Sequence, residues 1–145
     1  MKPAARGSST VSPCLMVESI NDELRFLKAV FGAQVGRQQG GDERTLWQVE
    51  VRLGDATLMI GRTNKLNPQS AGMLYVWTGD VDATYARAMK AGATLISAPT
   101  DQPSGVREAG FKDPQGQIWW LGERVRKVPG RSTTQKPRLQ RRKSA

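Results

Sequence analysis

The stretch of sequence that decides the fold is Gly110-Phe111-Lys112-Asp113-Pro114-Gln115-Gly116-Gln117-Ile118-Trp119-Trp120. Two extended segments, 106–111 and 118–121, flank an Asp-Pro-x-Gly sequence in this stretch. Proline fixes φ and glycine permits a positive φ, so the sequence predicts a tight turn with a structural role. We therefore expect two strands joined by a short connection at this point.

The same order of elements is predicted twice along the chain: a strand, a helix that ends at a glycine, and three further strands. The first helix, 21–31, follows an Asn21/Asp22 cap and ends at Gly32. The second, 81–91, follows an Asp80 cap and ends at Gly92. A glycine at a helix end is common in such connections, so this correspondence alone does not establish a repeat. The strands are predicted at 11–17, 33–39, 45–53 and 56–60 in the first unit, and at 73–78, 93–97, 106–111 and 118–121 in the second.

Length and charge divide the chain into three parts. Its 145 residues suit one domain, which we place at 11–123 as two units, 11–61 and 73–123, joined by a polar linker. Residues 1–10 are predicted to be a disordered arm and residues 124–145 a disordered basic tail. The tail holds all of the net charge of +9. The balanced body argues against a nucleic-acid-binding face on the fold, whereas the tail could contact nucleic acid or other anions weakly.

The composition excludes several kinds of chemistry. The chain has no histidine and a single cysteine, Cys14, so it has no disulfide within the chain and no imidazole or thiolate metal cluster. A histidine-activated nucleophile is excluded for the same reason, and phosphate-loop and dinucleotide motifs are absent. No apolar run is long enough to span a membrane, and residues 1–11 lack the apolar region of a signal peptide. A reducing cytoplasm is the expected location.

Five stretches of the chain carry a family resemblance. They are Ser12-Pro13-Cys14-Leu15-Met16-Val17, Val30-Phe31-Gly32-Ala33, Gln48-Val49-Glu50-Val51-Arg52-Leu53-Gly54-Asp55, residues 80–93, and Asp113-Pro114-Gln115-Gly116 before Trp119. Together they resemble the vicinal oxygen chelate superfamily of glyoxalases, bleomycin-resistance proteins and extradiol dioxygenases, and its PhnB-like branch in particular, over residues 11–123. The resemblance implies an α+β fold of paired βαβββ units that form a cupped, half-open β-barrel.

The resemblance also implies where a metal would bind. Enzymes of the family hold a divalent metal with four side chains, and those positions fall here on Ser12, Gln48, Met73 and Trp120. None of the four is a carboxylate or an imidazole, and a stable catalytic site needs about three strong ligands. We therefore expect no metal and no cofactor. The remaining possible oxygen ligands are Glu50, which shares a strand face with Gln48, Glu123 and Asp101.

The tryptophans suggest a different use of the cavity. Trp119 and Trp120 are adjacent on a strand and must point to opposite faces, and the resemblance directs Trp120 into the cavity. Packing in the core is the simpler alternative for such rings. The resemblance to PhnB-like members implies that Arg107 lies near the cavity mouth as an anion clamp, and the alternative is a surface position beside Glu108. The predicted ligand-binding residues are Trp47, Gln48, Glu50, Met73, Trp77, Arg107, Phe111 and Trp120.

Two functions follow as hypotheses. The first is a metal-free protein that binds and sequesters a small flat aromatic or cationic molecule, as bleomycin-binding members of the family do. The alternative is a glyoxalase-like lyase or isomerase acting on a small oxygenated substrate, with Glu50 as the base and Arg107 as the clamp. The resemblance implies a homodimer, although two units in one chain can also close alone. The sequence leaves the identity of the ligand open.

Overall fold

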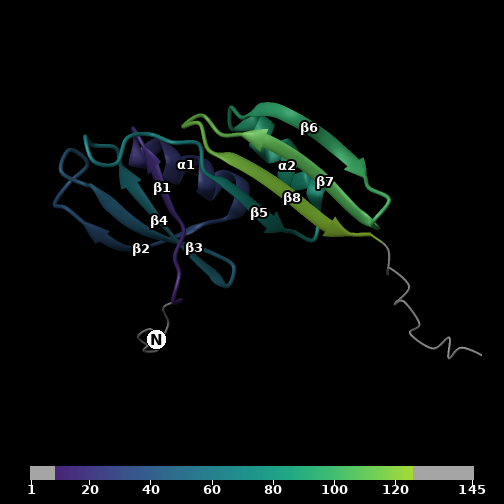
Figure 1. Cartoon of the computed structure of the whole chain (residues 1–145), viewed down its shortest axis with the longest axis horizontal. Coiled ribbons are helices and arrows are strands. Elements are labelled where there is room, and N and C mark those ends of the chain that lie inside the picture. The colour runs from purple at the N-terminus through teal and green to yellow at the C-terminus, as the bar shows by residue number, and fades with distance from the viewer. Residues whose placement is uncertain (1–8, 126–145) are drawn as a thin grey trace, which may run out of the picture.

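Each half of the chain folds into the same order of elements, as Figure 1 shows for the computed structural model, in which residues 9–125 are described. The first unit consists of β1 (Cys14–Val17), α1 (Ile20–Phe31), β2 (Gln34–Gln39), β3 (Gln48–Leu53) and β4 (Ala56–Arg62). The second consists of β5 (Met73–Trp77), α2 (Val81–Lys90), β6 (Thr94–Asp101), β7 (Val106–Lys112) and β8 (Ile118–Arg124). The predicted repeat of βαβββ is confirmed.

The two sheets have identical topology. Their strand orders are β1-β4-β3-β2 and β5-β8-β7-β6. In each sheet the first strand pairs in parallel with the last strand of its unit, and the other neighbours are antiparallel. Within residues 9–125 neither sheet closes into a barrel, so the α+β fold is two open, four-stranded sheets that lie side by side (Figure 1).

The helix ends follow from local chemistry, with one correction. Helix α1 is capped by Ser19 and not by Asn21 or Asp22, because Ser19 is extended and its Oγ accepts a hydrogen bond from the Asp22 N–H at 3.2 Å. Gly32 then adopts φ 63° and ends the helix as predicted. The cap of α2 is Asp80, also as predicted.

Several strand ends differ from the prediction. Strand β3 begins at Gln48 instead of residue 45, because Asp42 accepts hydrogen bonds from the N–H groups of Arg44 and Thr45 and folds that segment into a turn. Strands β4, β6, β7 and β8 each end later than predicted, and β1 begins at Cys14 instead of residue 11. Strand β6 forms an edge of its sheet, and its pairing with β7 is interrupted between Leu95 and Ser97 and again between Ser97 and Thr100.

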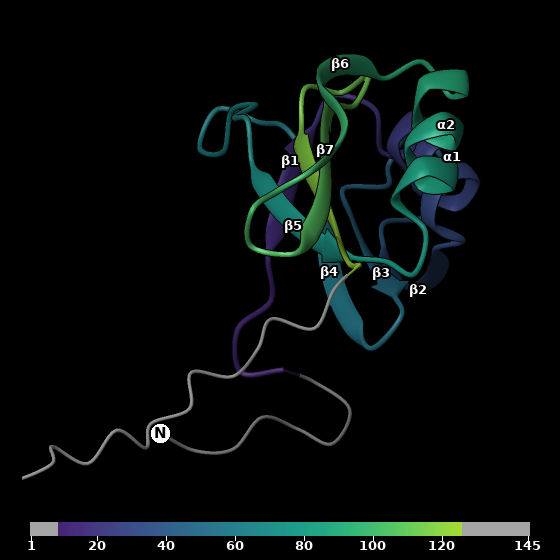
Figure 2. The ribbon, with the colours of Figure 1, turned by 90° about the vertical axis from the view of Figure 1, so that its right-hand side faces the viewer.

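The core lies between the sheets and the helices. Figure 2 shows α1 and α2 on one side of the molecule, with β5 and β7 on the other side. Phe111 and Trp119 have no exposed surface, and Phe31 at the end of α1 packs against both rings. The first unit therefore supplies part of the core of the second. No described helix has the length and apolarity that crossing a membrane requires.

The Asp-Pro-x-Gly turn ties the two units together. Gln117 is buried, and its side-chain amide donates to the carbonyls of Met16 and Ser70 at 3.1 Å and accepts from the Gly72 N–H at 2.7 Å. These bonds join β1, the linker and β8 at one end of β5. The predicted basic tail, 124–145, and the predicted arm, 1–10, lie largely outside the described residues, so their disorder and any anion binding stay predictions.

Candidate functional site

An exposed group of large side chains covers the side of the second sheet that faces away from the helices. On β5, Met73, Tyr75 and Trp77 alternate with core-facing residues and are 70%, 44% and 54% exposed. Tyr75 lies opposite Trp120 of β8 in the sheet register, so Trp120 shares this side. We call Met73, Tyr75, Trp77 and Trp120 the aromatic face.

Two glycines let the rings lie against the sheet. A Cβ at Gly110 would be 3.0 Å from three ring atoms of Trp120, and a Cβ at Gly122 would overlap the Tyr75 ring. Any side chain at these positions would lift the rings from the strands. The glycines therefore let the Tyr75 and Trp120 rings lie close against the strands.

Charged groups border the aromatic face. The Tyr75 hydroxyl donates to Oε1 of Glu108 at 2.8 Å, and the Arg124 guanidinium lies 4.6 Å from the centroid of the Trp77 ring. The rings of Tyr75 and Trp77 are 5.1 Å apart. Burial and the Glu108 carboxylate raise the pKa of Tyr75 to about 12, so its hydroxyl stays protonated at neutral pH. Ring faces next to a carboxylate attract cations, and Arg124 already occupies one such position.

The structure separates the predicted site residues into groups. It brings Met73, Trp77 and Trp120 together, and it places Trp119 in the core, so the prediction that the adjacent tryptophans point to opposite faces is confirmed. Gln48 and Glu50 lie together on β3 in the first sheet. Trp47, 53% exposed, directly precedes that strand.

Two predicted ligand-binding residues lie elsewhere. Arg107 donates to both carboxylate oxygens of Asp82 on α2, at 2.8 and 2.9 Å, and to Asp101 at 3.0 Å. These hydrogen bonds raise the pKa of Arg107 and lower the pKa of Asp82. They also hold the Arg107 guanidinium on the side of the sheet that packs against the helices. Phe111 is enclosed in the core on that same side. Both residues are therefore removed from the candidate ligand site.

The sequence analysis missed three residues of this site. Tyr75 has the same strand parity as Met73 and Trp77, so alternation alone could have identified it. Glu108 and Arg124 reach the aromatic face only through the pairing of β5 with β8 and of β8 with β7, for which the sequence carried no local signal.

The described acidic cluster does not form a site. Asp80, Asp82 and Glu123 lie close enough to share an ion, but each carboxylate already has a structural partner. Asp80 caps α2, Asp82 pairs with Arg107, and Glu123 accepts from the Val81 N–H at 2.9 Å. The cluster fixes the start of α2 against the second sheet.

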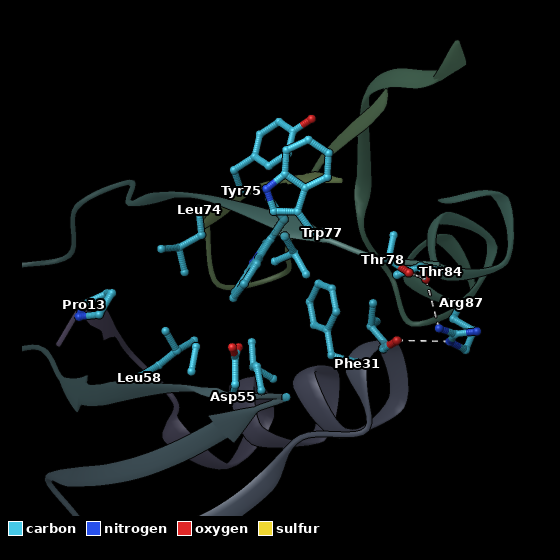
Figure 3. Close-up of a pocket in the computed structure, with 16 residues that line it drawn as sticks. Pro13, Phe31, Asp55, Leu58, Leu74, Tyr75, Trp77, Thr78, Thr84 and Arg87 are labelled. Atoms are coloured by element: carbon cyan, nitrogen blue, oxygen red, sulfur yellow. Dashed lines mark hydrogen bonds between the residues drawn. The ribbon is translucent and has the colours of Figure 1, made fainter. Parts of the chain in front are cut away.

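A cavity of about 500 Å³ lies between the two units (Figure 3). Leu58 from β4 and Leu74 from β5 line opposite sides, and Phe31 from the end of α1 lies between them. Trp77 borders it from the aromatic face, and Asp55 borders it from the turn between β3 and β4. Its volume falls within the roughly 300–1,000 Å³ range of small-molecule sites.

Comparison with known proteins supports the fold. A family model described as the Glyoxalase/Bleomycin resistance protein/Dioxygenase superfamily matches residues 10–121. The uncharacterized protein Rv0887c of Mycobacterium tuberculosis is 32% identical over 130 residues, covering 81% of this chain and 76% of Rv0887c. TioX from Micromonospora sp. ML1 matches with a TM-score of 0.69 and 22% identity, covering 81% of this chain and 100% of TioX.

A second solved structure has a descriptive name. TnmS3, an antibiotic binding protein from Streptomyces sp. CB03234, matches with a TM-score of 0.59 and 24% identity, covering 81% of this chain and 98% of TnmS3. At these identities the structural matches establish the fold and not the ligand.

Proposed function

Because the chain belongs to the glyoxalase/bleomycin resistance protein/dioxygenase superfamily, we propose that it binds and sequesters a small flat aromatic or cationic molecule without a metal. The observation that carries the proposal is the aromatic face. Tyr75 and Trp77 are exposed, the rings of Tyr75 and Trp120 lie over glycines, and the Glu108 carboxylate borders the face. Exposed rings in this arrangement offer stacking and cation–π contacts to a planar guest.

A homodimer would complete this site. In the part of the chain that the structure describes, the two sheets lie side by side, and no segment of residues 9–125 forms an opposing wall for the aromatic face. A second copy could supply that wall with the exposed side of its first sheet, which carries Gln48 and Glu50, and with the neighbouring Trp47. Large exposed apolar side chains such as Met73 and Trp77 are typical of a surface that binds a partner or a ligand.

The residues at the family's metal positions do not suit a divalent ion. Ser12 precedes β1 and Gln48 begins β3, whereas Met73 and Trp120 lie in the other sheet. The four offer a hydroxyl, an amide, a thioether and an indole, and an indole N–H only donates. Hard or borderline ions prefer carboxylate and imidazole ligands, so this set favours stacking over metal binding. The name of TnmS3 supports the proposal by analogy with its antibiotic binding.

The proposal is tested by replacing Trp120 with Ala. An acridinium cation, a flat cationic dye, would be titrated into the full chain and followed by tryptophan fluorescence. We expect saturable binding that weakens about tenfold in Trp120→Ala, because a stacked aromatic contact contributes on the order of 1 kcal/mol or more. Sedimentation of the complex should give twice the mass of one chain.

The matched control is Leu66→Ala, which removes an exposed apolar side chain from the linker. It should bind the dye like the unchanged protein. Equal affinity in Trp120→Ala and Leu66→Ala would contradict the proposed site. Turnover of a small oxygenated substrate that disappears in Glu50→Gln would instead favour the lyase or isomerase alternative.

A further inference from the structure

The cavity between the units arises from the way in which the two units are joined. Gln117 ties β1 to the linker at the start of β5, next to Gly72. At the other end of β5, Trp77 and Thr78 line the cavity together with the Gly54–Asp55 turn of the first unit. The junction is therefore closed by hydrogen bonds at one end and hollow at the other.

The walls of this cavity are largely apolar. In Figure 3, Leu74 lies above the space, Leu58 and Asp55 lie below it, and Phe31 lies beside it, whereas the Tyr75 and Trp77 rings project from β5 away from it. Leu58 and Leu74 come from different units, so a guest between them would contact both. Such walls suit an apolar or aromatic body of moderate size.

Two charged residues, Asp55 and Arg87, line this space at opposite ends. The Asp55 carboxylate points toward the ring side of the cavity in Figure 3, and no ion pair of Asp55 is found within residues 9–125. Arg52 lies nearby, but its Nε donates to the Gly54 carbonyl at 3.2 Å. At the far end, Arg87 is held by the Val30 carbonyl at 3.0 Å and by the Thr84 hydroxyl at 3.1 Å.

We infer that this cavity is a second binding site, for a lipophilic amine whose apolar body lies between the units and whose ammonium group pairs with Asp55. The carboxylate supplies the charge complement, at the end of the cavity away from the Arg87 guanidinium. The cavity shares Tyr75 and Trp77 with the aromatic face, whereas Trp120 does not line it, so a substitution of Trp120 distinguishes the two sites. Asp55 is exposed, so the ion pair adds little to the affinity, and its main effect is to favour a charged amine over a neutral molecule of the same shape.

The test uses two probes that differ in charge, 3-(1-naphthyl)propylammonium and 3-(1-naphthyl)propanol, measured by calorimetry on the full chain. We expect the ammonium to bind about fivefold more tightly than the alcohol. Asp55→Asn should remove that preference, because asparagine keeps the turn and loses the charge. Glu43→Gln makes the same charge change at an exposed position away from the cavity and should keep the preference.

Two further variants separate this site from the aromatic face. Ala56→Trp places a large ring on the wall of the cavity at an exposed strand end and should abolish binding of both probes. Trp120→Ala should leave their affinities unchanged. The inference is overturned if neither probe binds, if the preference survives in Asp55→Asn, or if Ala56→Trp, shown folded by circular dichroism, binds normally.

A dimer that fills the cavity would also overturn the inference. In that case both probes would fail to bind at concentrations where the chain is a dimer, and would bind on dilution. Loss of dye binding in Trp120→Ala with intact naphthyl binding would support both sites. Intact dye binding with no naphthyl binding would reject only the second site.

Discussion

At the scale of single residues, Glu23 is the least expected feature of the core. It lies on α1 with no exposed surface, and neither of its carboxyl oxygens has a hydrogen-bond partner among the described residues. Burial, together with the neighbouring Asp113, raises the pKa of Glu23 to about 9. The group is therefore protonated and neutral in the folded protein at pH 7.

This shift predicts how stability depends on pH. The unfolded chain releases the Glu23 proton near pH 4.5 and the folded chain near pH 9, so the folded state binds more protons between those values. The free energy of unfolding should fall as pH rises through this window, by up to about 1.4 kcal/mol per pH unit. Glu23→Gln cannot ionise and should lack this slope in urea denaturation measured at pH 6, 7.5 and 9.

The control for this experiment is Glu18→Gln, at an exposed position two residues before α1. It should follow the pH profile of the unchanged protein. Parallel profiles for Glu23→Gln and the unchanged protein would show that Glu23 is ionised in the folded state.

At the scale of elements, the glycines of β7 and β8 control the arrangement of the aromatic face. In Gly122→Ala the added methyl group would overlap the Tyr75 ring. Tyr75 is partly exposed, so the ring can turn outward and the fold is retained. We expect an altered near-ultraviolet circular dichroism spectrum and at least threefold weaker dye binding, since the Tyr75–Trp77 contact is disturbed.

The matched control is Gly79→Ala, where a Cβ would contact nothing within 4 Å. It should change neither the spectrum nor the affinity. An unchanged spectrum in Gly122→Ala would mean that the ring does not lie over this glycine in solution.

The sequence predicted those parts of the fold that depend on neighbouring residues. Gly32 and Gly92 have positive φ and follow the helices, and Asp80 caps α2, because each effect acts within one helical turn. The Ser19 cap was missed because Asn21 and Asp22 are equally suitable cap residues by type. The order of the strands within each sheet was not predicted, because it depends on pairing between strands that are distant in the sequence.

The candidate site was predictable in part for the same reason. Strand alternation correctly predicted that Trp119 and Trp120 point to opposite faces, whereas the placement of Trp120 in a cavity stays a prediction. Phe111 and Arg107 share a side of β7, but whether that side meets the helices depends on packing that spans both units. The hydrogen bonds from the Arg107 guanidinium to the Asp82 carboxylate join residues that are 25 positions apart, so no local sequence pattern predicts them.

At the scale of the whole molecule, Gln117 determines how firmly the two units are joined. Gln117→Leu would remove three hydrogen bonds and leave the carbonyls of Met16 and Ser70 and the Gly72 N–H without these partners. We expect a loss of about 2–4 kcal/mol in the free energy of unfolding. Thermal and urea denaturation of the full chain would measure it.

The comparison variant is Gln38→Leu, at an exposed position on β2. Its stability should stay within about 0.5 kcal/mol of the unchanged protein. An equally small effect for Gln117→Leu would mean that core packing between the units, and not the buried amide, holds them together.

The interrupted edge strand β6 has a consequence for the behaviour of the protein at high concentration. Leu95 and Ile96 are exposed on this edge, and a flat strand with such residues would recruit copies of itself into fibrils. The two breaks in its register bend the strand, and Pro99 lacks the N–H that a docking strand would need. The edge is thus a poor template for amyloid growth, even though its side chains alone would favour it.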